Sequence, residues 1–183
     1  MPELKTYCQF VASVQNDNVH RIYHDTQYGF LINDDNELFG RLILEINQAG
    51  LNWTIILNKE GNFRKAYLDF NIQKVASFTK KDRERLLTDV GIIRNKLKVN
   101  AAIHNASEIL KLQQGHGSFK NWLDKNHPMK LDNWLKLFKK TFKFTGGEIT
   151  NEFLTSTGYL KGAHEKECPI YDKILLQNPL WNK

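Results

Sequence analysis

The chain has 183 residues with a formal net charge of +6, and 41% of them are hydrophobic. That share supports an ordinary core and excludes a globally disordered chain, and no apolar run approaches the length of a membrane span. The positive charge favours an anionic partner such as nucleic acid, although many proteins carry such a charge without one. The first residues, MPELKTYCQF, show no basic segment followed by an apolar core, so we expect no secretory signal and a cytoplasmic protein.

Residues 1–37 show little periodicity and several turn formers, which predicts irregular structure. At the end of this segment, Asn33–Asn36 offer N-capping oxygens, and Glu37 adds negative charge to the first turn of the helix that follows. The stretch Leu38–Trp53 then carries apolar residues at helical spacing, so one helix face must be buried. Glu45 lies on the shoulder of that face. It is either a rim ion pair with Arg41 or part of a site.

Gly50 is a natural stop for this helix, and the turn after it presents Leu51 and Trp53. Beyond the turn, Ile55–Leu57 are expected to continue a buried segment. Three aromatic residues further on predict another short helix packed on it: Phe63, Tyr67 and Phe70.

Residues 81–113 predict a pair of helices joined by a tight turn. Asp82–Asp89 is typical of a short helix, Val90–Asn95 of a glycine-containing turn, and Lys96–Leu112 of a longer helix. Such a turn can aim backbone N–H groups at a phosphate, although an ordinary helical hairpin is the commoner explanation. Three basic side chains lie where they would attract a phosphate: Arg94, Lys96 and Lys98.

The rest of the chain also has helical periodicity. One short helix carries Phe119, Trp122 and Leu123, a second spans Leu131–Thr141, and a third begins at a capping-box pattern, Thr145–Glu148, and ends at Gly158. No convincing strand or internal repeat appears. The predicted fold class is all-α.

The only two cysteines, Cys8 and Cys168, lie near opposite ends of the chain, and a disulfide between them is disfavoured in a reducing compartment. Cys168 follows His164 with three residues between, and His24 is the best-placed N-terminal histidine. Two thiolates and two imidazoles form a closed tetrahedral set suited to a structural zinc ion that would join the termini. The alternative is two buried thiols and surface histidines.

Several stretches together resemble the DNA-3-methyladenine glycosylase I family. They are Cys8 with Phe10 close behind, and the four runs YHDTQYG, LEINQAGLNW, GIIRNKLKVNAAIHNA and FKKTFKFTGGEITNEFLTSTGYLKGAHEKEC. These runs cover most of the chain and are highly specific as a set. The chain differs from many members in having Phe10 and Tyr28 where they have Trp, and in a longer run before Cys168.

The resemblance implies an all-α fold of the helix-hairpin-helix glycosylase superfamily in a single domain, 1–183. Its helical core would be about 35–160, with zinc-binding terminal segments of about 1–30 and 160–175. One structural Zn²⁺ would be bound by four ligands: Cys8, His24, His164 and Cys168. The implied activity is monofunctional hydrolysis of the N-glycosidic bond of 3-methyladenine in alkylated double-stranded DNA, which releases the free base and initiates base excision repair. We expect a monomer with no membrane partner.

The resemblance also implies roles for individual residues. Glu45, the catalytic residue, would contact the flipped base while Tyr23 assists and Trp53 stacks on it. Phe10 and Tyr28 would complete the aromatic lining of the base pocket. A cationic alkylated adenine suits an electron-rich ring and a carboxylate acceptor.

DNA contacts are expected from two further places. Leu51 is either a wedge in the gap left by the flipped base or an ordinary core residue. The hairpin would bind a backbone phosphate through Gly91, Arg94 and Lys98.

Two other functions fit parts of the pattern. A non-catalytic, zinc-stapled DNA-binding module would use the same hairpin but release no base. A metallohydrolase using the zinc directly would need an open coordination position, and a fourth protein ligand argues against it.

Overall fold

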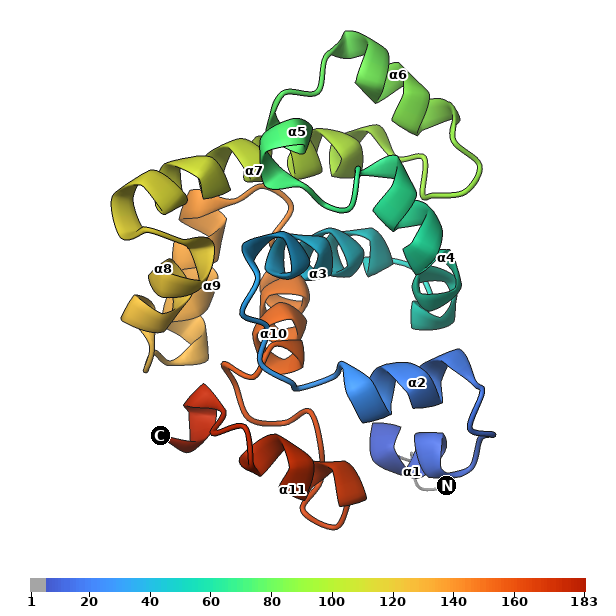
Figure 1. Cartoon of the computed structure of the whole chain (residues 1–183), viewed down its shortest axis with the longest axis vertical. Coiled ribbons are helices and arrows are strands. Elements are labelled where there is room, and N and C mark those ends of the chain that lie inside the picture. Colours follow the sequence, from blue (N-terminus) through green and yellow to red (C-terminus); the bar gives the residue numbers. More distant parts are fainter. Residues whose placement is uncertain (1–5) are drawn as a thin grey trace. The chain divides into compact units, whose positions relative to one another are not determined.

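The computed structural model describes residues 6–183, and within that range the protein is entirely helical, which confirms the predicted fold class (Figure 1). The chain divides into two compact units. We call Met1–Leu31 with Leu154–Lys183 the terminal unit, and Ile32–Phe153 the central unit. Residues 1–5, part of the segment predicted to be irregular, lie outside the described residues. No helix among the described residues is long and apolar enough to cross a membrane.

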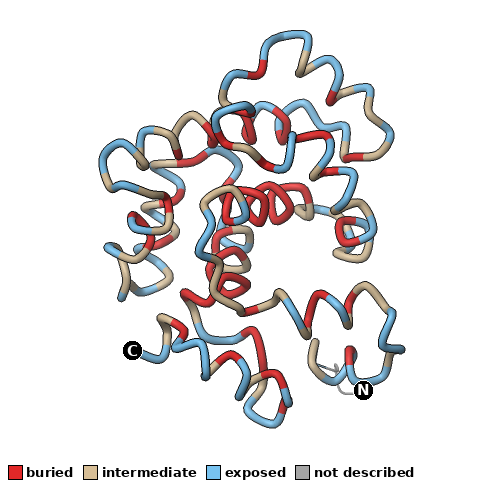
Figure 2. Tube along the Cα trace, viewed as in Figure 1, coloured by how far each residue is buried: buried red, intermediate tan, exposed pale blue. Residues whose placement is uncertain are grey.

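The central unit is built around α3 (Asp35–Gln48), which packs against α4, α5, α7 and α8. Figure 2 shows α3 buried along nearly its whole length. The other helices of this unit are α4 (Trp53–Ala66), α5 (Ile72–Ala76), α6 (Lys80–Thr88), α7 (Lys96–His116), α8 (Phe119–Asn126) and α9 (Leu131–Thr141), and α10 (Gly147–Ser156) begins here and ends in the terminal unit.

Helix α3 starts and stops where the sequence predicts. The Asp34 carboxylate accepts hydrogen bonds from the backbone N–H groups of Asn36 (2.9 Å) and Glu37 (3.0 Å), so the predicted N-terminal cap is confirmed. The helix ends at Gln48, and Gly50 has a φ of +77°, a left-handed conformation that glycine adopts without strain. Trp53 lies beyond this turn, as the first residue of α4.

Helix α4 differs from the prediction of a buried segment followed by a separate short helix. It is one helix of 14 residues, and Ile55 on it is 40% exposed. Tyr67 and Phe70 lie after its end and are buried. The reason is tertiary: a Cβ on Gly40 of α3 would lie 2.4 Å from the Phe70 ring, so the ring packs directly on the α3 backbone.

The predicted capping box at Thr145–Glu148 is wrong. The Thr145 hydroxyl donates to the carbonyl oxygens of Phe138 (3.2 Å) and Phe142 (3.4 Å) instead of accepting from the first turn of α10. Threonine hydroxyls bond local carbonyls readily, and here the turn after α9 places two within reach.

The terminal unit contains α1 (Tyr7–Ala12), α2 (Val19–Thr26), α11 (Pro169–Leu175) and a 3₁₀ turn, η1 (Leu180–Asn182). Two helices therefore lie in a segment predicted to be irregular, so that prediction is wrong for α1 and α2 and holds for residues 13–18 and 27–34. Helix α1 starts at a capping box in which Thr6 and Gln9 each accept the other's backbone N–H.

Candidate active site and metal centre

Four side chains of the terminal unit converge on one point. They come from α1, from α2 and from the segment that leads into α11: Cys8, His24, His164 and Cys168. Their ligand atoms all lie within 4.8 Å of one another, and three of the four residues are buried. The two chain ends predicted to share a metal are therefore brought together.

The spacing between sulfur and nitrogen atoms can be compared with that of a zinc centre. His24 Nε2 lies 3.4 Å from Cys8 Sγ and 3.7 Å from Cys168 Sγ. His164 Nδ1 lies 3.8 Å from Cys8 Sγ and 3.5 Å from Cys168 Sγ. Zinc bonds of about 2.3 Å to sulfur and about 2.1 Å to nitrogen, at tetrahedral angles, give a separation of roughly 3.6 Å. The four donor atoms therefore fit a tetrahedral zinc site in which the protein supplies every ligand.

The other nitrogen of each histidine has its own partner. His24 Nδ1 lies 2.7 Å from the Asp25 carboxylate, and His164 Nε2 lies 2.8 Å from the Tyr28 carbonyl oxygen. These acceptors favour the tautomers that leave His24 Nε2 and His164 Nδ1 as free lone pairs facing the cluster. Asp25 is part of the run YHDTQYG, but the sequence analysis did not predict this role for it. Its position directly after His24 was the available signal.

Burial shifts the pKa values of two groups in the cluster. It lowers the pKa of His164 to about 4, which keeps the imidazole neutral at pH 7, and raises the pKa of the Cys8 thiol to about 11. A bound cation would reverse the second effect, because a coordinating thiol is deprotonated. Metal binding at this cluster therefore releases protons.

The aromatic residues predicted for the base pocket on the N-terminal side lie beside this cluster in the terminal unit. Tyr23 is buried and its ring centroid lies 5.5 Å from that of Tyr28. Phe10 is 38% exposed. Tyr7, which the sequence analysis did not single out, contacts the rings of both Phe10 and Tyr28 at 6.3 and 5.6 Å. Its position next to Cys8 was the signal that could have found it.

The other predicted base contacts lie in the central unit. Glu45 on α3 is 5% exposed and Arg41 is 6% exposed, so the interpretation of Glu45 as a solvent-exposed rim residue does not hold. Leu51 and Trp53 are half-buried and sit on the turn into α4. That turn is fixed locally: Leu51 N–H donates to the Gln48 carbonyl oxygen (2.7 Å), and Gln48 Nε2 donates to the Leu51 carbonyl oxygen (3.0 Å).

The helical hairpin predicted from the sequence is formed by α6, the turn after it, and α7. Arg94 in the turn is exposed. The backbone N–H groups of Ile93 and Arg94 have no hydrogen-bond acceptor within residues 6–183, whereas Gly91 N–H donates to the Asp89 carboxylate (2.7 Å). The turn thus contains N–H donors without a partner in the described residues and a cation, the groups that a phosphate would need.

Lys98 is placed differently from Arg94. It is 5% exposed, and its ammonium donates to the carbonyl oxygens of Asn47 (2.9 Å) and Ala49 (2.7 Å). Burial lowers the pKa of Lys98. Its side chain therefore faces the end of α3, within the central unit.

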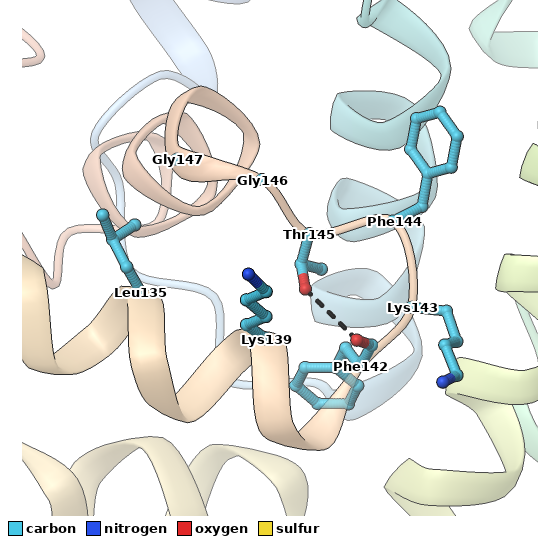
Figure 3. A pocket seen from close by; sticks show the side chains of 8 residues that line it. All are labelled: Leu135, Lys139, Phe142, Lys143, Phe144, Thr145, Gly146 and Gly147. Atoms are coloured by element: carbon cyan, nitrogen blue, oxygen red, sulfur yellow. Dashed lines mark hydrogen bonds between the residues drawn. The ribbon is translucent and has the colours of Figure 1, made fainter.

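A cavity of about 500 Å³ lies between α9 and α10 in the central unit, and Figure 3 shows Lys139 pointing into it. The loop at its edge is anchored by Asn105, which exchanges two hydrogen bonds (3.0 and 2.7 Å) with the Lys143 backbone. Phe144, with a φ of +60°, points away from Lys139 in Figure 3, and its ring centroid lies 5.8 Å from Lys98 Nζ. None of the predicted base contacts lines this cavity.

Comparison with known proteins identifies the class to which this fold and cluster belong. Residues 13–135 match the family model described as "Methyladenine glycosylase". The chain is 33% identical to DNA-3-methyladenine glycosylase 1 of Escherichia coli K12 over 177 residues, which cover 86% of this chain and 94% of that protein. It is 29% identical to DNA-3-methyladenine glycosylase of Haemophilus influenzae over 187 residues, covering 91% and 98%.

Solved structures agree with the sequence comparison. The structure of 3-methyladenine DNA glycosylase I (TAG) from Staphylococcus aureus, described as the structural basis of 3-methyladenine recognition, superposes with a TM-score of 0.78 at 32% identity, covering 85% of this chain and 93% of that one. A TAG variant in complex with 3-methyladenine gives the same TM-score at 31% identity, covering 85% and 94%. The chain belongs to the methyladenine glycosylase family. The resemblance seen in the sequence is confirmed.

Proposed function

We propose that this chain is a single-domain, monomeric DNA glycosylase that hydrolyses the N-glycosidic bond of 3-methyladenine in alkylated double-stranded DNA. The observation that carries the proposal is the match over nearly the whole length of a DNA-3-methyladenine glycosylase. The burial of Glu45 on the helix that leads to Trp53 supports it.

The chemistry of the lesion explains why such residues suffice. A base inside the duplex is out of reach, so it must be flipped out at a cost of a few kcal/mol. Methylation at N3 makes adenine cationic, which weakens its pairing and makes it a good leaving group. The main task of an enzyme acting on this base is therefore to recognise its positive charge, and strong acid catalysis of base release is not needed.

In this proposal, Glu45 and Trp53 form the cation-selective part of the base pocket. The indole face of Trp53 attracts a cationic ring more than a neutral one. The Glu45 carboxylate accepts a hydrogen bond from the adenine amine and stabilises positive charge in a site from which water is excluded. The contacts with the flipped base that the resemblance implies for Tyr23, Phe10 and Tyr28 stay predictions. Water then attacks the sugar C1′ as the oxocarbenium-like centre forms.

The metal would have a structural part. A Zn²⁺ ion bound by Cys8, His24, His164 and Cys168 would cross-link the two ends of the chain, and four protein ligands leave no position for a substrate. Neither cysteine is in a disulfide, and zinc-binding cysteines have to stay reduced, so we propose a cytoplasmic location.

We further propose that the hairpin turn binds a DNA phosphate through Arg94 and the free N–H groups beside it, with Gly91 allowing the tight turn. A Cβ on Gly91 would lie 2.9 Å from Asp89 Oδ1 and 3.2 Å from Asn62 Cβ, so a larger residue there would displace the Asp89 carboxylate and crowd Asn62. Leu51, on the fixed turn before α4, enters the gap left by the flipped base.

The test is the base released from methylated duplex DNA by the purified protein, identified by mass spectrometry. We expect 3-methyladenine from the wild type and a loss of at least about a hundredfold in single-turnover rate for Glu45→Gln. Glu148→Gln, which removes an exposed carboxylate elsewhere in the central unit, is the control and should react like the wild type. DNA binding without release of any base would support the non-catalytic module instead, and full activity of Glu45→Gln would remove Glu45 from the pocket.

A further inference from the structure

Two lysine ammonium groups join the hairpin to the helices on either side of the Leu51–Trp53 turn, all within the central unit. Lys98, at the start of the second hairpin helix α7, donates to two carbonyl oxygens at the end of α3. Lys59 on α4 donates to the carbonyl oxygens of Val90 (3.0 Å) and Gly91 (3.1 Å) in the hairpin turn. The turn that carries Trp53 is thus tied to the hairpin from both of its sides.

The contacts of Lys98 are those of a structural cap. The last carbonyl groups of a helix have no partner within it, and a cation there also interacts favourably with the helix dipole. Lys98 satisfies the Asn47 carbonyl in the last turn of α3 and the Ala49 carbonyl just after it, one residue before the left-handed Gly50. The Phe144 ring, 5.8 Å from Nζ, covers the same ammonium.

Three observations speak against Lys98 as a phosphate ligand. Its side chain is 5% exposed, and its ammonium already has two acceptors at 2.9 and 2.7 Å. Releasing it to reach DNA would leave the buried Asn47 carbonyl and the partly buried Ala49 carbonyl without this donor, which is unfavourable. Arg94 lies four residues earlier and is exposed, so the hairpin has a cation available for that contact.

We propose that Lys98 and Lys59 are positioning residues, which hold the hairpin at a fixed distance from the Leu51–Trp53 turn. In the proposed function, on which this inference rests, the hairpin binds a backbone phosphate while the turn receives the flipped base. The two lysines then set the offset between bound phosphate and extruded nucleotide. Neither touches substrate, and both act by fixing backbone carbonyl groups.

The experiment separates positioning from phosphate binding by measuring two quantities. The first is the single-turnover rate of 3-methyladenine release at saturating DNA. The second is the Kd for duplex DNA containing a stable abasic analogue, measured across a range of salt concentrations. The variants are Lys98→Met and Lys59→Met, which keep a similar chain length and remove the ammonium. Lys111→Met is the control, because Lys111 is also on α7, is 68% exposed, and gives the same change in net charge.

We expect both variants to lose about tenfold to a hundredfold in saturated rate, since a small displacement of a reacting group costs this much. The slope of log Kd against log salt should equal that of Lys111→Met. A slope reduced by about one with an intact saturated rate would make the lysine a phosphate ligand and overturn the proposal. Saturated rates equal to the control would overturn it as well.

Two further measurements keep the outcome clear. Melting temperatures confirm that each variant is folded at the assay temperature. Lys98→Arg retains a cation able to reach the α3 carbonyls, so it should release 3-methyladenine faster than Lys98→Met does. If Lys98→Met does not fold, Lys98→Arg should still keep part of the wild-type rate. If both variants are folded and Lys98→Arg is no faster than Lys98→Met, the positioning role of Lys98 is contradicted. Absence of base release by the wild type would instead contradict the proposed function, before any variant is compared.

Discussion

The Arg64 guanidinium and the Glu37 carboxylate form two parallel hydrogen bonds, Nη1–Oε1 at 2.7 Å and Nη2–Oε2 at 2.8 Å. They join the last turn of α4 to the first turn of α3, the two helices on either side of the Leu51–Trp53 turn. This bidentate geometry is the strongest form of an arginine–carboxylate pair, although both side chains are partly exposed, at 34% and 46%.

The pair predicts a pH dependence of stability. The hydrogen bond from Arg64 lowers the pKa of Glu37 below its usual 4.5, against the opposing effect of burial. The pair's contribution is therefore complete above pH 4.5 and is lost as the pH falls through the lower pKa of the folded state. We expect Glu37→Gln to reduce the free energy of unfolding by about 0.5–1 kcal/mol at pH 7, after allowing for solvent screening, and by less below pH 4.

Urea unfolding at pH 7 and pH 3.5 measures this difference. Glu84→Gln is the control, since Glu84 is 65% exposed and lies 3.9 Å from its partner Lys80. A Glu37→Gln penalty that stays constant with pH would show that the loss is one of packing and not of charge.

Loss of one cysteine ligand should remove the metal. We expect Cys168→Ser to contain less than one zinc per chain by mass spectrometry under native conditions. With free zinc at about 1,000 times its Kd, the lost stabilisation is about 4 kcal/mol. For a chain of this size that lowers the melting temperature by roughly 10 °C. His104→Ala, at a half-exposed histidine of the central unit, should leave both quantities unchanged. Equal melting of the zinc-free and zinc-bound wild type would refute the structural role.

Substitution of Gly29 is a second way to disturb the metal cluster. Its φ is +81°, and an added Cβ would lie 2.6 Å from Ala163 Cβ and 3.4 Å from His164 Cδ2. Gly29→Ala should therefore destabilise the protein by about 2 kcal/mol or more and weaken zinc retention against a chelator. Gly61→Ala is the matched control: Gly61 lies inside α4 with open space around it, and alanine there should stabilise by about 0.5–1 kcal/mol. Equal zinc retention by the two variants would contradict the prediction.

Arg94→Ala tests the hairpin. It should weaken binding to undamaged and damaged duplex DNA alike, and reduce the slope of log Kd against log salt by about one, because one phosphate contact is lost. Lys111→Ala, which removes the same charge from the other end of α7, should leave the slope unchanged. A slope like that of the wild type would place the phosphate contact elsewhere.

Local patterns predicted some helices well and others not at all. The bounds Leu131–Thr141 of α9 agree with the sequence prediction, since its apolar residues recur at a clear helical period and two of them, Trp134 and Phe138, are buried. Helix α1 has only 6 residues, too few for a period to show, although the capping box at Thr6 was a usable signal. The same pattern at Thr145 was false, because the Thr145 hydroxyl donates to one carbonyl group in α9 and to another just after its end.

The candidate site divides in the same way. The set of four metal ligands could be predicted, because ligand chemistry depends on residue type and the terminal unit brings all four together. The environment of Lys98 could not be predicted. It lies four residues after Arg94, so its place in the sequence predicts a second cation for the hairpin, and only the packing of α7 on the end of α3 reveals its two carbonyl partners. Which charged side chain is buried depends on contacts distant in sequence.

The positions of the four metal ligands in the sequence also affect the order in which the protein folds and binds metal during synthesis. Cys8 and His164 are separated by 156 positions, so the two N-terminal ligands are synthesised well before the other two. The central unit is one continuous segment, Ile32–Phe153, and its residues have all been added before His164 is. On a ribosome the central helices can therefore fold before His164 and Cys168 have been synthesised. Zinc would then be captured only after the whole central unit has been synthesised.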